Sequence, residues 1–240
     1  MKYGRQVALV SIFAAMHAVL YCVSFDPAWR NFAIYLAPLE GIVLGPQVGF
    51  VAALLGSSIG RLIKPDLLWM FGIVAEPLGV LMVALLARAK WKPVALVYAV
   101  LLSAYFIHPY GRSLPPWTIL DIFVALVLIF PAAKLSKWIY AGDSGKVFLS
   151  VALLAFLYSA TDSLVRIFML VPAGLHTLFF DSYETLASVF VGAAMFSYIE
   201  DILIVVVSLT IITPVLLRSP ILNLLGTKKR VEETKQSARK

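Results

Sequence analysis

Hydrophobic residues in this chain gather in long unbroken runs and do not alternate with polar residues. They fill eight stretches separated by short polar, glycine or proline breaks, at about residues 5–24, 32–45, 47–63, 69–87, 93–107, 117–134, 147–171 and 187–217. Most are long enough to cross a hydrocarbon core of about 30 Å, and a backbone in lipid must satisfy its own hydrogen bonds. The pattern therefore predicts an all-α, polytopic integral membrane protein, a helical bundle with six to eight membrane helices.

The second apolar stretch is too short to span a membrane alone. It ends at Gly45-Pro46, which is a turn signal, and glycines such as Gly41, Gly49 and Gly56 allow neighbouring helices to approach closely. We therefore expect residues 32–63 to form a tight helical hairpin.

Composition and charge support the membrane assignment and predict an orientation. Hydrophobic residues make up 61% of the chain and charged residues 14%, which leaves too little polar surface for a soluble globule. If the N-terminus and the hairpin turn are cytoplasmic, the cytoplasmic segments hold fifteen of the twenty lysines and arginines. Positively charged short loops stay in the cytoplasm, so both termini are predicted to be cytoplasmic. The predicted parts are a transmembrane domain, residues 1–218, and a basic, flexible cytoplasmic tail, residues 219–240.

Ionisable side chains interrupt the apolar stretches at seven places. A charge at this depth costs several kcal/mol unless it is paired or lines a wet cavity. The predicted threading places almost all of them in the middle or the outer half of the membrane, which indicates a polar pocket facing outward. They are Glu40, Arg61, Glu76, Asp121, Asp162, Arg166 and the adjacent pair Glu200-Asp201.

Eight residues form the predicted substrate site: Arg61, Trp69, Glu76, Arg112, Trp117, Asp121, Asp162 and Arg166. The arginines suit a carboxylate or phosphate and the acidic residues suit an amine, so a zwitterionic ligand and simple mutual pairing both stay open. Asp162 and Arg166 are four residues apart, which favours an ion pair on one helix face. Trp69 and Trp117 fit either the mouth of the pocket or the aromatic belt of a membrane protein.

Signatures of catalysis and cofactor binding are weak in this sequence. Residues 142–147 contain a Gly-Lys pair, but the first glycine is misplaced and no Ser or Thr follows the lysine, so this is no phosphate-binding loop. His17 fits a core histidine bonded to a neighbour, while His108 and His176 fall in outer loops, where a metal site with Asp181 is the less favoured alternative. We expect no metal, no cofactor and no enzymatic activity.

One region resembles a known transporter family. Residues 37–50, Ala-Pro-Leu-Glu-Gly-Ile-Val-Leu-Gly-Pro-Gln-Val-Gly-Phe, continued to Gly60, are similar to the second-to-third helix region of the substrate-binding S components of energy-coupling factor (ECF) vitamin transporters. On the first helix, Ala14 and Ala18 resemble the motif with which those proteins dock on their coupling subunit. Alanines four apart also make a smooth stripe for any packed helix.

The resemblance implies a function and a set of partners. Members of the family capture a vitamin or precursor from outside, associate with a transmembrane coupling subunit and two cytosolic ATPases, and reorient to release it inside. They have six helices, so the hairpin over residues 93–138 would be an addition. The chain lacks the Met-His start of the cobalt and nickel branch, which favours an organic micronutrient. The implied location is the plasma membrane, with the basic tail attracted to anionic lipid and no role for nucleic acid.

Two other classes of function remain open at this point. In a self-standing secondary transporter, the carboxylates at mid-depth would couple ions to solute movement, although the inner halves of the helices offer no polar path. In a membrane-embedded enzyme, Asp162, Glu200 and Asp201 would perform acid-base chemistry.

Overall fold

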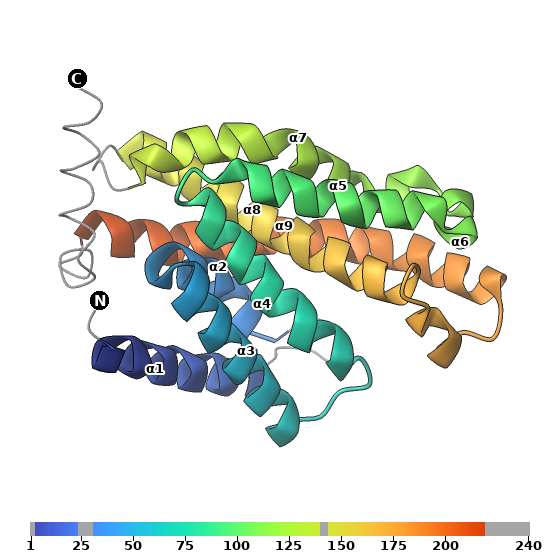
Figure 1. Cartoon of the computed structure of the whole chain (residues 1–240), viewed down its shortest axis with the longest axis horizontal. Coiled ribbons are helices and arrows are strands. Elements are labelled where there is room, and N and C mark those ends of the chain that lie inside the picture. The colour runs from blue at the N-terminus through green and yellow to red at the C-terminus, as the bar shows by residue number, and fades with distance from the viewer. Residues whose placement is uncertain (1–2, 24–30, 140–143, 219–240) are drawn as a thin grey trace.

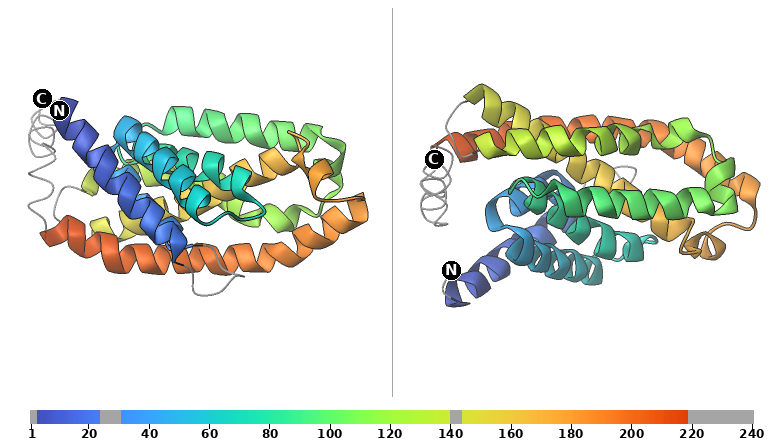
Figure 2. Two further views of the ribbon diagram at one scale, coloured as in Figure 1. Left: turned by 90° about the horizontal axis from the view of Figure 1, so that it is seen from below. Right: turned by 45° about the horizontal axis from the view of Figure 1, so that its top comes forward.

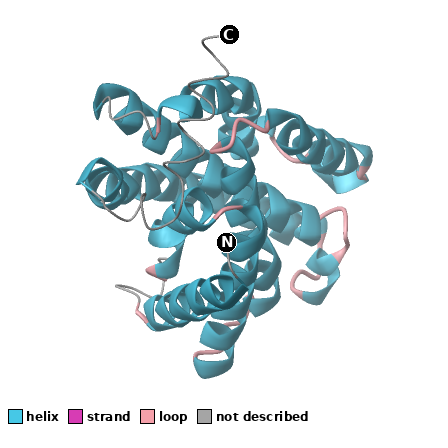
Figure 3. Cartoon of the chain, turned by 60° about the vertical axis from the view of Figure 1, so that its left-hand side comes forward, coloured by secondary structure: helices cyan, strands magenta, loops and turns pink. Residues whose placement is uncertain are grey.

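The structure, a computed structural model, describes residues 3–23, 31–139 and 144–218. Within these ranges every regular element is helical (Figure 3), which confirms the all-α prediction. The elements are α1 (Tyr3–Cys22), α2 (Ala33–Leu44), α3 (Pro46–Ile63), α4 (Trp69–Leu86), α5 (Trp91–Ile107), α6 (Pro109–Ser113), η1 (Pro116–Ile119), α7 (Leu120–Leu135), η2 (Ser136–Trp138), α8 (Ser144–Leu170), η3 (Leu175–Leu178) and α9 (Tyr183–Arg218).

Six of the described helical segments are long and apolar enough to cross a membrane. They are α1, α3, α4, the segment from η1 through α7 to η2, α8 and α9. Helices α2 and α5 are apolar but shorter, with 12 and 17 residues. The eight predicted stretches therefore correspond to eight helices, and six of these reach spanning length. The predicted tail, residues 219–240, lies outside the described residues.

The longer helices run back and forth between two ends of the bundle (Figures 1 and 2). The start of α1, the α2–α3 turn, the α4–α5 turn and the end of α9 lie at one end, which we call the terminal end. The α3–α4 link, α6 and η3 lie at the opposite end, which we call the pocket end. The same alternation of helix direction was assumed when fifteen of the twenty lysines and arginines were assigned to cytoplasmic segments. The orientation of the bundle in a cell remains a prediction.

The turn between α2 and α3 consists of one residue, Gly45, with φ +87°. A side chain there would be strained, and its Cβ would also lie 2.3 Å from the guanidinium of Arg88. Pro46 follows as the first residue of α3, where its missing N–H costs no hydrogen bond. The hairpin predicted over residues 32–63 is confirmed.

Helix α1 packs closely on α3 through small residues. A Cβ on Gly56 would lie 2.5 Å from the Cβ of His17 and 2.9 Å from the carbonyl oxygen of Ala14. Ala14 and Ala18 are 5% and 4% exposed, so the alanine stripe faces the interior of the chain. A docking role for this stripe stays a prediction. In this conformation a partner could reach the two alanines only if α1 moved.

Helix α8 is the central helix of the bundle. It contacts α4, α5, α7 and α9, and α4 in turn packs on α2 and α3. Gly79 of α4 lies against the ring of Tyr158 of α8, where a Cβ would come within 2.8 Å of a ring carbon. The close approach of α4 and α8 brings Glu76 of α4 near Arg166 of α8.

Candidate ligand-binding site

A buried ion pair joins α3 to α4. Arg61 donates from Nη2 to Oε1 of Glu76 at 2.5 Å and from Nη1 to Oε2 at 3.2 Å. Gly72, one turn before Glu76, makes room for the guanidinium, because a Cβ there would lie 1.6 Å from Nη2 of Arg61. Two residues predicted to bind substrate are therefore engaged with each other.

His17 of α1 extends this pair to a second carboxylate. Its Nδ1 lies 3.0 Å from Oε1 of Glu40 on α2, and its Nε2 lies 3.3 Å from Oε2 of Glu76. The side chains of His17, Glu40, Arg61 and Glu76 are each at most 5% exposed. We call these four residues the buried quartet. The expectation of a core histidine bonded to its neighbours is confirmed.

A second ion pair lies on α8 beside the quartet. Arg166 donates from Nε to Oδ2 of Asp162 at 2.6 Å, which confirms the pair expected from their spacing of four residues. Nη2 of the same guanidinium lies 3.7 Å from Oε1 of Glu76. Arg166 therefore connects the quartet to a neighbouring space between the helices.

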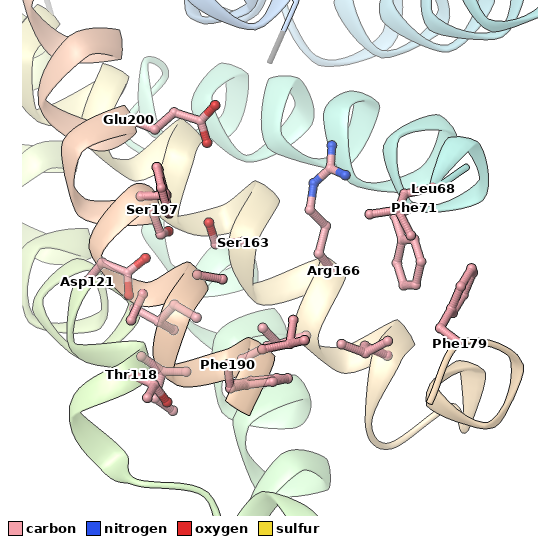
Figure 4. A pocket seen from close by; sticks show the side chains of 18 of the residues that line it. Leu68, Phe71, Thr118, Asp121, Ser163, Arg166, Phe179, Phe190, Ser197 and Glu200 are labelled. Atoms are coloured by element: carbon pink, nitrogen blue, oxygen red, sulfur yellow. The ribbon is translucent and has the colours of Figure 1, made fainter. Parts of the chain in front are cut away.

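That space is a cavity of about 450 Å³ between α4, η1, α7, α8, the segment after η3, and α9. Most of its lining is apolar, with Phe71, Phe179 and Phe190 among the larger side chains. In Figure 4 the carboxylate of Glu200 and the guanidinium of Arg166 point toward the same side of the cavity. Ser163 and Ser197 lie between α8 and α9. The polar and charged lining residues are Thr118, Asp121, Ser163, Arg166, Ser197 and Glu200.

The cavity begins at the pocket end and extends deep between the helices. Leu68 and Phe179 line it from the links at that end. Along α9 its lining runs from Val189 to Glu200, which is about 16 Å at the rise of an α-helix. Cavities of roughly 300–1,000 Å³ with apolar walls and a few convergent polar groups are typical of small-molecule sites. The geometry suits a compact molecule with an apolar body and polar ends.

An aromatic cluster lies at the same end of the bundle. The rings of Tyr110 and His176 are 5.1 Å apart, and His176 and His108 are 5.8 Å apart. Tyr110 also contacts Tyr183 at the start of α9, with ring centroids 5.1 Å apart. Partial burial, and then the neighbouring His176, lower the pKa of His108. No group of three metal-ligating residues occurs here or elsewhere in the described ranges.

The structure divides the eight predicted site residues into three groups. Asp121 and Arg166 line the cavity, while Arg61, Glu76 and Asp162 form the ion pairs next to it. Trp69, Trp117 and Arg112 are exposed and do not line the cavity. Their neighbours Phe71 and Thr118 contribute to its lining. A role of any of these residues in substrate binding remains a prediction.

Several lining residues were not predicted from the sequence. Phe71, Phe179 and Phe190 give no distinctive signal in a chain with 15 phenylalanines, and Ser163 and Ser197 are equally inconspicuous. A signal existed only for Glu200, as a carboxylate within an apolar stretch.

Glu200 and Asp201 point in different directions, as expected of adjacent helical residues. Glu200 lines the cavity, whereas Asp201 lines a separate hollow of about 400 Å³ between α7, α8 and α9. Asp121 lines both spaces. Tyr198 donates a hydrogen bond to the carbonyl oxygen of Trp117 and so joins α9 to η1 beside this hollow.

Comparisons with known proteins give partial similarities. No protein-family model matches the chain, and no solved structure does. The chain is 26% identical over 131 residues to an uncharacterized protein of Methanocaldococcus jannaschii, covering 54% of this chain and 44% of that one. It is 32% identical over 78 residues to the probable biotin transporter BioY of Pyrococcus horikoshii, covering 32% of this chain and 48% of that one. The chain thus spans about half the length of the curated relatives it matches. It is a multi-pass helical membrane protein with partial similarity to a transporter.

Proposed function

We propose that this chain is the membrane-embedded substrate-capture subunit of an ECF-type importer and binds a small organic micronutrient, a vitamin or precursor. The observation that carries the proposal is the cavity of about 450 Å³ at the pocket end. Its walls are mostly apolar, and its charged lining residues are Asp121, Arg166 and Glu200. The partial similarity to a probable biotin transporter supports it. Leu68 and Phe179 line the cavity from the links at the pocket end. The predicted cytoplasmic segments gather at the opposite, terminal end of the bundle (Figure 1).

Arg166 is the residue we expect to anchor an anionic group of the substrate. Its guanidinium is oriented by Asp162 at 2.6 Å, so little side-chain entropy remains to be lost on binding. Glu200 and Asp121 contribute carboxylates to the α9 and α7 sides of the cavity, where hydroxyl or amine groups would bind. Phe71, Phe179 and Phe190 would enclose the apolar body of the substrate.

Energy for transport would come from partner proteins. The chain carries no phosphate-binding loop, so ATP hydrolysis is assigned to two cytosolic ATPase subunits that act through a transmembrane coupling subunit. The location proposed for the complex is the plasma membrane. The basic segment 219–240, which lies outside the described residues, would contact anionic lipid on the cytoplasmic side.

A binding experiment with two arginine variants tests the site. The protein, purified in lipid nanodiscs, would be titrated with biotin and a panel of other water-soluble vitamins, and binding measured by calorimetry. For a ligand that carries an anion, Arg166→Ala should weaken binding by roughly 2 to 5 kcal/mol, partly because the ion pair between Arg166 and Asp162 is also lost. Arg112→Ala is the matched control, since Arg112 is exposed and outside the cavity lining. Equal weakening by both variants would place the site elsewhere.

An uptake experiment separates this proposal from a secondary transporter. The chain would be reconstituted in liposomes with and without an ECF coupling subunit and its ATPases. Uptake that requires ATP and those subunits is expected. Uptake by the chain alone, driven by a proton or ion gradient, would replace the proposal with secondary transport.

A further inference from the structure

The buried quartet contains more hydrogen-bond acceptors than a neutral histidine can serve. Both ring nitrogens of His17 face a carboxylate oxygen, at 3.0 Å for Glu40 and 3.3 Å for Glu76. An ionised carboxylate only accepts hydrogen bonds, and a neutral imidazole donates through one nitrogen only. Without a further proton, one nitrogen lone pair would face a carboxylate inside the bundle.

The partners of Glu76 decide where this proton lies. Glu76 accepts two hydrogen bonds from Arg61, which requires its ionised form, so Nε2–H of His17 donates to Glu76. Nδ1 then faces Oε1 of Glu40, whose other oxygen, Oε2, accepts no hydrogen bond from the described residues. The contact between Nδ1 and Oε1 therefore requires a proton on one of its two atoms.

Charge balance leads to the same result. Within the quartet, ionised Glu40 and Glu76 share the single positive charge of Arg61, because the charge of nearby Arg166 is balanced by Asp162. With a neutral His17 the quartet would carry one uncompensated negative charge while almost completely buried. Such a charge costs several kcal/mol in a membrane, and one added proton removes it.

We propose that the quartet is a proton-binding site, which holds one proton between Nδ1 of His17 and Oε1 of Glu40 at neutral pH and so fixes α1 against α2. The inference does not depend on the proposed transport function. Other charged or titratable groups near the quartet come from α1, the α3–α4 link and α8. They are Tyr21, Asp66, Asp162 and Arg166.

The site has an electrostatic connection to the cavity. Arg166 lines the cavity, and its Nη2 lies 3.7 Å from Oε1 of Glu76, the carboxylate that also contacts His17. A positive charge near the quartet disfavours the proton. An anion that neutralised Arg166 would therefore strengthen proton binding, and by reciprocity the proton would strengthen binding of the anion.

Nuclear magnetic resonance of the full chain in nanodiscs, with ¹⁵N-labelled histidine, tests the site directly. The protein has three histidines, and His17→Gln, or Glu40→Gln if that variant does not fold, assigns the His17 signal. At about pH 8, where a solvated imidazole is neutral, we expect one of two results. In the first, both His17 nitrogens are protonated. In the second, only Nε2 is protonated, and the infrared spectrum shows a band of a protonated carboxylic acid that disappears in Glu40→Gln. His108 and His176 serve as internal references.

Three variants sharpen the test. In Glu40→Gln, His17 should become neutral with its proton on Nε2, because the amide can donate to Nδ1 and the remaining charges of Glu76 and Arg61 balance. Glu200→Gln, the same change at another buried glutamate, should leave the His17 signal as it is. In Arg166→Gln the quartet should keep its proton up to a pH roughly one unit higher than in the unmodified protein, because a nearby positive charge is removed.

Three results would overturn the proposal. The first is a neutral His17 at about pH 8 without a protonated carboxylic acid at Glu40, because the contact would then hold no proton. The second is a His17 that remains doubly protonated in Glu40→Gln, which would assign the proton to Glu76 alone. The third is an Arg166→Gln variant that loses the proton at an unchanged or lower pH, which would remove the connection to the cavity.

Discussion

Replacing Gly56 by alanine should separate α1 from α3. The added Cβ would lie 2.5 Å from the Cβ of His17 and 2.9 Å from the carbonyl oxygen of Ala14. Carbon atoms in contact are normally about 3.5–4.0 Å apart, so α1 has to withdraw by about 1 Å. A backbone oxygen is among the obstructing atoms, and rotation of a side chain alone cannot relieve the overlap.

The magnitude follows from the cost of overpacking. Extra methyl groups in a packed core cost roughly 1–3 kcal/mol, and in a chain of this size each kcal/mol lowers Tm by roughly 2–4 °C. The apparent Tm of Gly56→Ala, followed by circular dichroism in detergent micelles, should therefore fall by roughly 2–12 °C. Hydrogen exchange should accelerate in α1 and remain unchanged in the second half of α9.

A glycine on another membrane helix provides the control. Gly192 of α9 has nothing within 4 Å of the position of an added Cβ. Gly192→Ala should keep or slightly raise the Tm, because alanine favours a helix by about 1 kcal/mol over glycine. Equal Tm values for the two variants, or faster exchange in α9 than in α1, would refute the close α1–α3 packing.

Three further predictions concern topology, the alanine stripe and pH. A cysteine at Ser113 should react with an impermeant thiol reagent outside intact cells and one at Ser144 should not; labelling at Ser144 alone would reverse the orientation. Ala14→Leu should lower Tm because Ala14 is buried against α3, whereas Ala15→Leu on the exposed face should not. An unchanged Tm in both variants would indicate that the alanine stripe does not pack against α3. The pKa of His108 is lowered in the folded state, so its contribution to stability is complete above about pH 6.5 and declines as the pH falls toward the lowered value. The decrease in Tm between about pH 7.5 and pH 5 should thus be smaller in His108→Gln, and an equal decrease would show that His108 contributes nothing.

Local features of the fold could be predicted because the membrane and the chain itself determine them. A lipid environment allows long apolar segments only the helical form, so the eight stretches were predictable. Gly45-Pro46 specifies the turn between α2 and α3 within two residues. Asp162 and Arg166 are four residues apart on one helix, and helix geometry alone brings them together.

The pairing of charges between helices could not be predicted in the same way. Arg61 and Glu76 lie on different helices, as do His17 and Glu40, and their contacts depend on how each helix is rotated about its axis. Depth in the membrane identified these residues as buried. It did not distinguish residues that neutralise one another from residues that line a cavity.

Rotation also explains why Trp69, which the sequence singled out, does not line the cavity, while a neighbouring aromatic residue does. Trp69 and Phe71 are two residues apart on α4, which corresponds to about 200° around the helix axis. Phe71 therefore lines the cavity, whereas Trp69 is exposed on the other side. Tryptophan near a helix end is conspicuous in a membrane sequence, but the interfacial belt accounts for such residues equally well.

The burial of Ala14 and Ala18 changes what docking of a partner would require. His17 lies between them in sequence and joins α1 to α2 and α4 through Glu40 and Glu76. Movement of α1 away from α3, which would uncover the alanines, would therefore also break the buried quartet. Because the proposed proton neutralises that quartet, its loss would weaken the attachment of α1. A proton-dependent exposure of the alanine stripe would then connect the state of the cavity, through Arg166 and Glu76, to the surface that a coupling subunit would contact.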